Sequence, residues 1–189
     1  MGATPVFALD ETVEGLKLDY QEWEPGGDPY ASRALITPQF MRLDYGVDGE
    51  GFILFDREAG MVYSVQVEDQ RILEVAALAD DAAGIGEPPI PLVLAQSSEA
   101  DDNAPSLGGR QPVITEFTVN DELCQQTVSI AGLLPEAVSA WREFALLMAA
   151  QRATTLHNTP PEFWQACSLA NEIYAPTRYL QQGLPIRAY

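Results

Sequence analysis

The chain has 189 residues, and its 28 acidic residues outnumber its 10 basic ones, which gives a formal charge of −18. This charge excludes the classes of protein that bind nucleic acid phosphates or anionic membranes through a basic surface. Hydrophobic residues make up 47% of the chain, so one domain of this length can bury a real core, and no apolar run reaches the roughly 18 residues of a transmembrane helix.

The chain to about residue 76 is predicted to be rich in β-strands. Segments 12–23, 32–37 and 40–45 have strand character, with turn signals at 26–29 and 46–49. Alternation then predicts a half-buried antiparallel strand with Met61, Tyr63, Val65 and Val67 on one face. Strands at 52–56 and 72–76 precede and follow it.

The middle of the chain, 77–111, is predicted to be an acidic surface loop rich in Gly, Pro and Ser, with an edge strand at 91–95. Its acidic clusters, 80–81 and 99–103, lack the alternate-residue spacing of a calcium loop and are expected to be solvated charge. A hairpin is predicted over 112–131, turning at Asn120-Asp121.

The last part of the chain is predicted to be helical, at 134–156 and 160–175. Pro135 suits a first helical position, Thr159-Pro-Pro-Glu162 has the form of a capping box, and Pro176 ends the second helix. Strands first and helices last predict a single α+β domain over 1–189. Its expected architecture is a curved antiparallel sheet, an open half-barrel of meander topology, with two C-terminal helices packed on one face.

The two cysteines are both predicted to point toward the core, Cys124 from a strand and Cys167 from the second helix. A disulfide between them would close a loop of about 40 residues and imply an oxidising compartment. Two buried free thiols are the alternative. Met1-Gly2 directly before Ala3 is typical of a start placed on a trimmed mature chain, so we expect a removed signal peptide and a periplasmic or otherwise exported protein, with a cytoplasmic location as the open alternative.

Residues that could perform catalysis are not grouped in any recognisable motif. His157, the single histidine, is expected in an exposed turn after the first helix, and no nucleophile, phosphate loop or dinucleotide motif accompanies it. We therefore expect no enzyme activity, no metal site and no cofactor. Arg42 lies outside if the Met41 face of its strand meets the helices, and inside an apolar cleft if the sheet is inverted.

Residues 36–45, followed by Asp48-Gly49 and 52–57, resemble the lipoprotein-carrier superfamily (LolA/LolB-like). The positions that carry the resemblance are Pro38, Phe40, Arg42, Asp48, Gly49, Phe55, Asp56 and Val62. The resemblance implies an unclosed antiparallel barrel with helices over an apolar cavity. It covers about 30 residues, and in those carriers most of the helical lid lies between strands, whereas the helices predicted here follow residue 133.

Two hypotheses of function follow. The first is a non-enzymatic exported protein that binds a lipid or other apolar group in a sheet–helix cleft. The residues expected to line that cleft are Arg42, Trp141, Phe144, Phe163 and Trp164. The second is an interaction or structural module that recognises a protein partner through a sheet edge or the acidic loop. Neither involves nucleic acid or an integral membrane segment.

Overall fold

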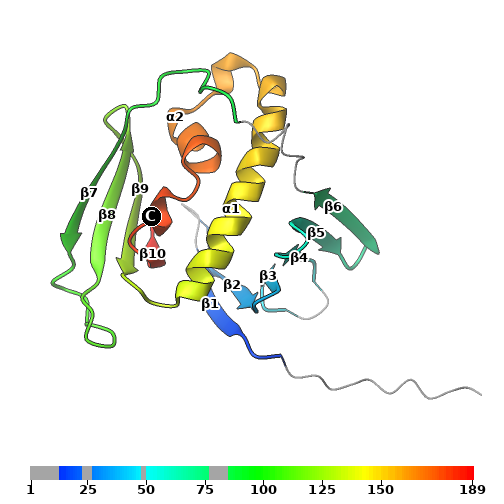
Figure 1. The fold of residues 1–189 in the computed structure, drawn as a ribbon, viewed down its shortest axis with the longest axis horizontal. Helices are drawn as coiled ribbons and strands as arrows, with labels where there is room; N and C mark the ends of the chain where they lie inside the picture. Colours follow the sequence, from blue (N-terminus) through cyan, green and yellow to red (C-terminus); the bar gives the residue numbers. More distant parts are fainter. Residues whose placement is uncertain (1–12, 23–26, 48–49, 77–84) are drawn as a thin grey trace, which may run out of the picture.

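A computed structural model describes residues 13–22, 27–47, 50–76 and 85–189. In the described residues two antiparallel sheets flank a central layer of helical segments (Figure 1). The α+β class predicted from the sequence is confirmed. Predictions that involve the start of the chain, Trp23, Asp48-Gly49 or the acidic pair at 80–81 lie outside the described residues.

The first sheet is a meander of six strands that pair in chain order. Its strands are β1 (Leu16–Glu22), β2 (Tyr30–Ile36), β3 (Phe40–Asp44), β4 (Phe52–Asp56), β5 (Met61–Gln66) and β6 (Arg71–Ala76). The register aligns Ile36 with Met41, Met41 with Phe55, and Phe55 with Val62. These four side chains therefore share one face, and all are buried.

The core lies between that face and α1 (Pro135–Thr155), with Ala137 and Ala140 fully buried against the sheet. Small residues on this side of the helix allow a close approach to the strands. The guanidinium of Arg57 adds a bidentate ion pair to Glu143 of α1, with two N–O distances of 2.7 Å. The turn between β4 and β5 is thus tied to the helix as well as packed under it.

The face of β5 that meets α1 is the one carrying Val62, which is 3% exposed. The Met61 face, which the alternation of the sequence singled out, is the opposite face of the strand. Met61, Tyr63 and Val65 are only half-buried, because they lie on the side away from the helix. The packed face carries Val62 together with the polar Ser64 and Gln66, so alternation alone pointed to the opposite face.

The second sheet has four strands in the order β10-β9-β8-β7. Their bounds are β7 (Leu94–Ala100), β8 (Val113–Val119), β9 (Glu122–Ile130) and β10 (Leu184–Ala188). The predicted hairpin over 112–131 corresponds to β8 and β9. The loop predicted over 77–111 is wrong in part, because β7 occupies seven of its residues as the outer edge of this sheet. The predicted edge strand at 91–95 is displaced toward the C-terminus.

The predicted single curved sheet is replaced by two separate sheets, because β10 pairs with β9 and no described strand bridges β10 to β1. Gly183 allows the chain to enter β10. Its φ is +106°, and a Cβ there would lie 2.5 Å from the carbonyl oxygen of Ile130. A side chain at this position would push β10 away from β9.

The second predicted helix, 160–175, is a broken series of short helical segments instead. After α1 the chain forms 3-10 turns η1 (Leu156–Asn158) and η2 (Pro161–Phe163), then α2 (Ala166–Leu169), a π-helical turn η3 (Ala170–Tyr174) and a 3-10 turn η4 (Arg178–Leu180). Trp164 and Gln165 are extended, so α2 starts later than predicted. The predicted capping box is absent, since no side chain caps η2.

A disulfide joins Cys124 of β9 to Cys167 of α2, as one of the two sequence-based alternatives predicted. The covalent bond holds α2 against the second sheet. The helical segments that follow α2 lead directly into β10, so this bond also helps to place the last strand of the chain.

Candidate functional site

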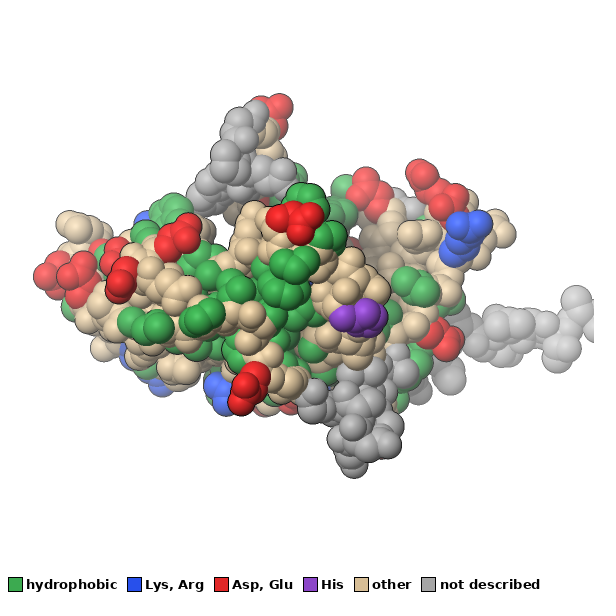
Figure 2. Space-filling model, turned by 90° about the horizontal axis from the view of Figure 1, so that it is seen from above, with side chains coloured by type: hydrophobic (Ala, Val, Ile, Leu, Met, Phe, Trp, Pro, Cys, Tyr) green, Lys and Arg blue, Asp and Glu red, His purple; other side chains and the backbone are tan. Residues whose placement is uncertain are grey.

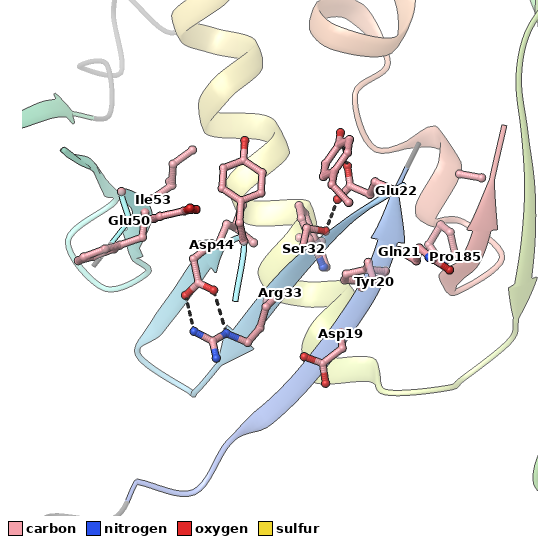
Figure 3. A pocket seen from close by; sticks show the side chains of 18 of the residues that line it. Asp19, Tyr20, Gln21, Glu22, Ser32, Arg33, Asp44, Glu50, Ile53 and Pro185 are labelled. Carbon is pink, nitrogen blue, oxygen red and sulfur yellow. Dashed lines mark hydrogen bonds and ion pairs between the residues drawn. The ribbon is translucent and has the colours of Figure 1, made fainter. Parts of the chain in front are cut away.

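The described residues form an open cleft of about 1650 Å³. It lies where β1 of the first sheet and β10 of the second sheet come near each other, beside the N-terminal half of α1 (Figure 3). Apolar side chains on its lining come from both sheets, α1 and η4. They include Ala34, Leu43, Ile53, Trp141, Leu180 and Leu184. The cleft is therefore built from segments that are far apart in the sequence.

Aromatic groups with polar atoms occur along the same lining, with Trp141 contributed by α1, Tyr20 by β1 and Tyr179 by η4. Burial raises the pKa of the Tyr20 phenol, and the nearby Trp141 indole opposes that shift in part. Burial also raises the pKa of Tyr179, as does the neighbouring Tyr20. The indole Nε1 of Trp141 is buried without a hydrogen bond of normal geometry. This part of the cleft therefore offers polar atoms within an apolar surface.

At the border of the cleft Asp44 binds two guanidinium groups. Arg33 donates to both of its carboxylate oxygens at 2.8 and 3.0 Å, and Arg42 donates at 2.7 Å (Figure 3 shows the Arg33 pair). Burial opposes ionisation of Asp44, but Arg33, the Gly46 amide and Arg42 more than offset it, so the pKa of Asp44 is lowered. The cluster ties the middle of β2 to the end of β3 beside the cleft.

A second polar group on the lining surrounds the carboxylate of Glu22 at the end of β1. Tyr30 donates to it at 3.2 Å and Ser32 also donates to it, both from β2. The ring of Tyr30 meets that of Tyr45 edge-on, with centroids 6.1 Å apart. These contacts order the side chains at the mouth of the cleft.

Of the five residues predicted to line a cleft, only Trp141 does so. Arg42 lies on the face of β3 away from Met41 and α1, where it covers the ring of Phe52 at 4.0 Å. Phe144 packs in the core against Phe55, with ring centroids 5.8 Å apart. Met41 is buried against α1, and Arg42 is therefore on the outer face of β3. This is the first of the two alternatives predicted for Arg42 from the sequence.

Phe163 and Trp164 lie elsewhere, near the C-terminal end of α1. They border a shallow depression of about 240 Å³ that does not join the main cleft. Phe163 is 68% exposed, while Trp164 donates its indole N–H to the carbonyl oxygen of Thr159 at 3.0 Å. The structure thus divides the predicted aromatic group among the cleft, the core and this depression.

His157 is exposed in η1, as predicted. Figure 2 shows the face at this end of the molecule, where acidic side chains are scattered and hydrophobic ones form a band across the middle. Among the described residues no three His, Cys, Asp or Glu side chains are grouped so that they could hold a metal ion. In the same part of the chain no helix is long and apolar enough to span a membrane.

Comparisons with protein-family models, curated proteins and solved structures gave no match. The lipoprotein-carrier resemblance therefore stays a prediction.

Sequence reasoning missed most of the cleft, including Tyr20, Tyr179 and the whole of β10. The signal that could have found Tyr20 was the alternation of Leu16, Leu18 and Tyr20, which places the tyrosine on the packed face of β1. The signal for β10 is weak, because Leu184–Ala188 is short and contains a proline, which disfavours a strand.

Proposed function

We propose that the protein is a non-catalytic binding protein and that the cleft between β1 and β10 takes the apolar group of its ligand. The observation that carries this proposal is the cleft itself, which is open to solvent and lined by Trp141, Ile53 and Leu184 among other apolar groups. Ligand sites in proteins are concave and mostly apolar, with a few polar groups that set orientation. The phenols of Tyr20 and Tyr179 and the ordered carboxylates at the border fit that description.

A location outside the cytoplasm is part of the proposal. The Cys124–Cys167 disulfide supports it, because disulfides persist in oxidising compartments and are rare elsewhere. In such a compartment the bond would maintain the placement of α2 and, through it, one wall of the cleft.

Binding of an uncharged apolar probe tests the proposal. N-phenyl-1-naphthylamine emits strongly only in an apolar site, so titration with the protein should give saturable enhancement. Trp141→Ala should weaken binding about tenfold or more, because it removes the largest apolar group of the cleft. Trp164→Ala is the matched control, since this tryptophan borders the separate depression and should leave the affinity unchanged.

Folding of each variant is checked by circular dichroism. Ile53→Asn offers a second change in the cleft if Trp141→Ala does not fold. Absence of saturable enhancement in the wild-type protein, or equal loss with both tryptophan variants, would refute the proposed site.

A further inference from the structure

The cleft is bounded by an edge strand on each side. β1 is the outermost strand of the first sheet and pairs only with β2, whereas β10 is the outermost strand of the second sheet and pairs only with β9, among the described residues. Residues 19–22 of β1 and 184–189 around β10 both line the cleft. In Figure 3 Gln21 of β1 and Pro185 of β10 lie on facing sides.

Edge strands have backbone N–H and C=O groups that point away from their sheet and bind water until another strand pairs with them. At this cleft two such edges face one space. We propose that the ligand is an extended polypeptide segment that pairs with β1, β10 or both as an added strand. This inference rests on the proposed binding function of the cleft and names the class of its ligand.

A polypeptide can form hydrogen bonds with the backbone groups at the two strand edges, whereas an acyl chain cannot. The backbone of an added strand supplies donors and acceptors for the exposed edges, and its side chains alternate between the two faces. Those on one face would lie against Trp141 and Leu184, and those on the other would reach solvent beside Asp19. The length of the edges, 7 residues in β1 and 5 in β10, suits a segment of similar length.

The charge of the cleft indicates which side chains the segment carries. Six carboxylates line it, from Asp19, Glu22, Asp44, Glu50, Glu68 and Asp69, against the guanidinium groups of Arg33 and Arg187. Arg33 is already paired with Asp44. The complement is a segment with basic residues at solvent-facing positions and apolar residues between them.

The two other sheet edges offer less for such a ligand. β7 is exposed along its whole length, and no apolar group of the cleft lies beside it. β6 carries Ile72 and Leu73, each 64% exposed, but it has no second edge facing it in the described residues. Only β1 and β10, within the described part of the chain, border the same hollow.

The test compares three seven-residue peptides with blocked ends. The first alternates lysine and valine. The second has the same side chains with N-methyl groups on all of its backbone nitrogens, and the third has glutamate in place of lysine. We expect the first peptide to bind in calorimetric titration and to displace N-phenyl-1-naphthylamine. The N-methylated peptide should bind at least tenfold more weakly, because it has no backbone N–H group left to donate to the edge of β1 or of β10.

Hydrogen exchange locates the bound peptide. Amides of 16–22, of 184–188 or of both should exchange more slowly when the lysine–valine peptide is present. The variant Glu50→Gln/Glu68→Gln/Asp69→Asn should raise the Kd about tenfold at low salt and less at high salt, because these exposed carboxylates act at a distance. The matched control is Glu58→Gln/Asp102→Asn/Glu162→Gln, which removes the same charge outside the cleft.

The outcomes distinguish failure of strand addition from failure of the proposed binding function. Equal affinity of the first two peptides, protection confined to β6 or β7, or tighter binding of the glutamate peptide would overturn strand addition. Probe binding at the cleft without peptide binding would also overturn it, while the proposed binding function would stand. If neither probe nor peptide binds, both proposals fail.

Discussion

Removal of the Cys124–Cys167 disulfide should destabilise the protein by about 4 kcal/mol. The two residues are 43 positions apart, and the chain-entropy relation for a loop of this length gives roughly that loss at 25 °C. For a chain of this size each 1 kcal/mol corresponds to about 2–4 °C, so the melting temperature should fall by about 8–16 °C. The perturbation is the double variant Cys124→Ser/Cys167→Ser.

The assay is urea unfolding followed by circular dichroism, on samples whose oxidation state is verified by intact mass. Reduction of the wild-type protein should produce a loss similar to that of the double variant, and it serves as the control for the serine side chains. A loss below about 1 kcal/mol would refute the reasoning, because the unfolded chain would then gain little freedom when the bond is absent. The slope of the transition shows whether the unfolded state has expanded.

Three further predictions concern polar groups of the core and the cleft. Asn171→Ala should cost about 2–3 kcal/mol in urea unfolding, because the Asn171 amide oxygen accepts two bonds, at 3.0 and 2.7 Å, from the buried Arg178 guanidinium. The Arg57 hydrogen bonds lower the pKa of Glu143 from its ordinary value of 4.5. The ionised Glu143 side chain therefore stabilises the fold fully above pH 4.5, and this stabilisation is lost as the pH falls through the lowered pKa. Calorimetric melting temperatures of the wild type and Glu143→Gln should therefore converge in acid. The pKa of Tyr20 is raised from 10.0 by burial, so its contribution to stability is present below 10.0 and is lost as the pH rises through the raised pKa. Absorbance at 295 nm should show late-ionising phenols, and Tyr20→Phe should reduce this late change only in part, because burial raises the pKa of Tyr179 as well.

Matched controls apply to these experiments. Gln181→Ala removes an exposed amide and should change stability by less than about 0.5 kcal/mol. Glu162→Gln removes an exposed carboxylate from η2 and should leave the melting temperature largely unchanged. Tyr189→Phe replaces a phenol that is 60% exposed and is the control for the loss of one tyrosine from the absorbance. Equal effects from control and test variants would contradict the contacts described.

The sequence predicted α1 and the β8–β9 hairpin well, because residues at their ends determine where they begin or turn. α1 was expected at 134–156 and spans 135–155, because Pro135 provides a preformed first turn. The β8–β9 hairpin was expected to turn at Asn120-Asp121, and both residues have positive φ, of 52° and 66°. Asn and Asp tolerate that conformation better than most residues, so the turn was readable from the sequence.

The sequence did not predict features that depend on distant partners. The extended conformation of Trp164 and Gln165 interrupts a stretch with good helical periodicity, and the Trp164 indole bond to Thr159 accompanies that break. The separation into two sheets depends on β10 returning to β9 rather than to β1. The cleft follows from that choice, so only its contribution from α1, Trp141, was predicted.

The position of β10 has a consequence for the order of folding. The first sheet is a meander of neighbours, so its contacts are local and can form early. Leu184 of β10, in contrast, pairs with Ile130, roughly 50 positions earlier in the chain. During synthesis this wall of the cleft can form only after residues 184–188 have been made, later than every other described strand. A nascent chain therefore has no complete cleft until β10 has been translated.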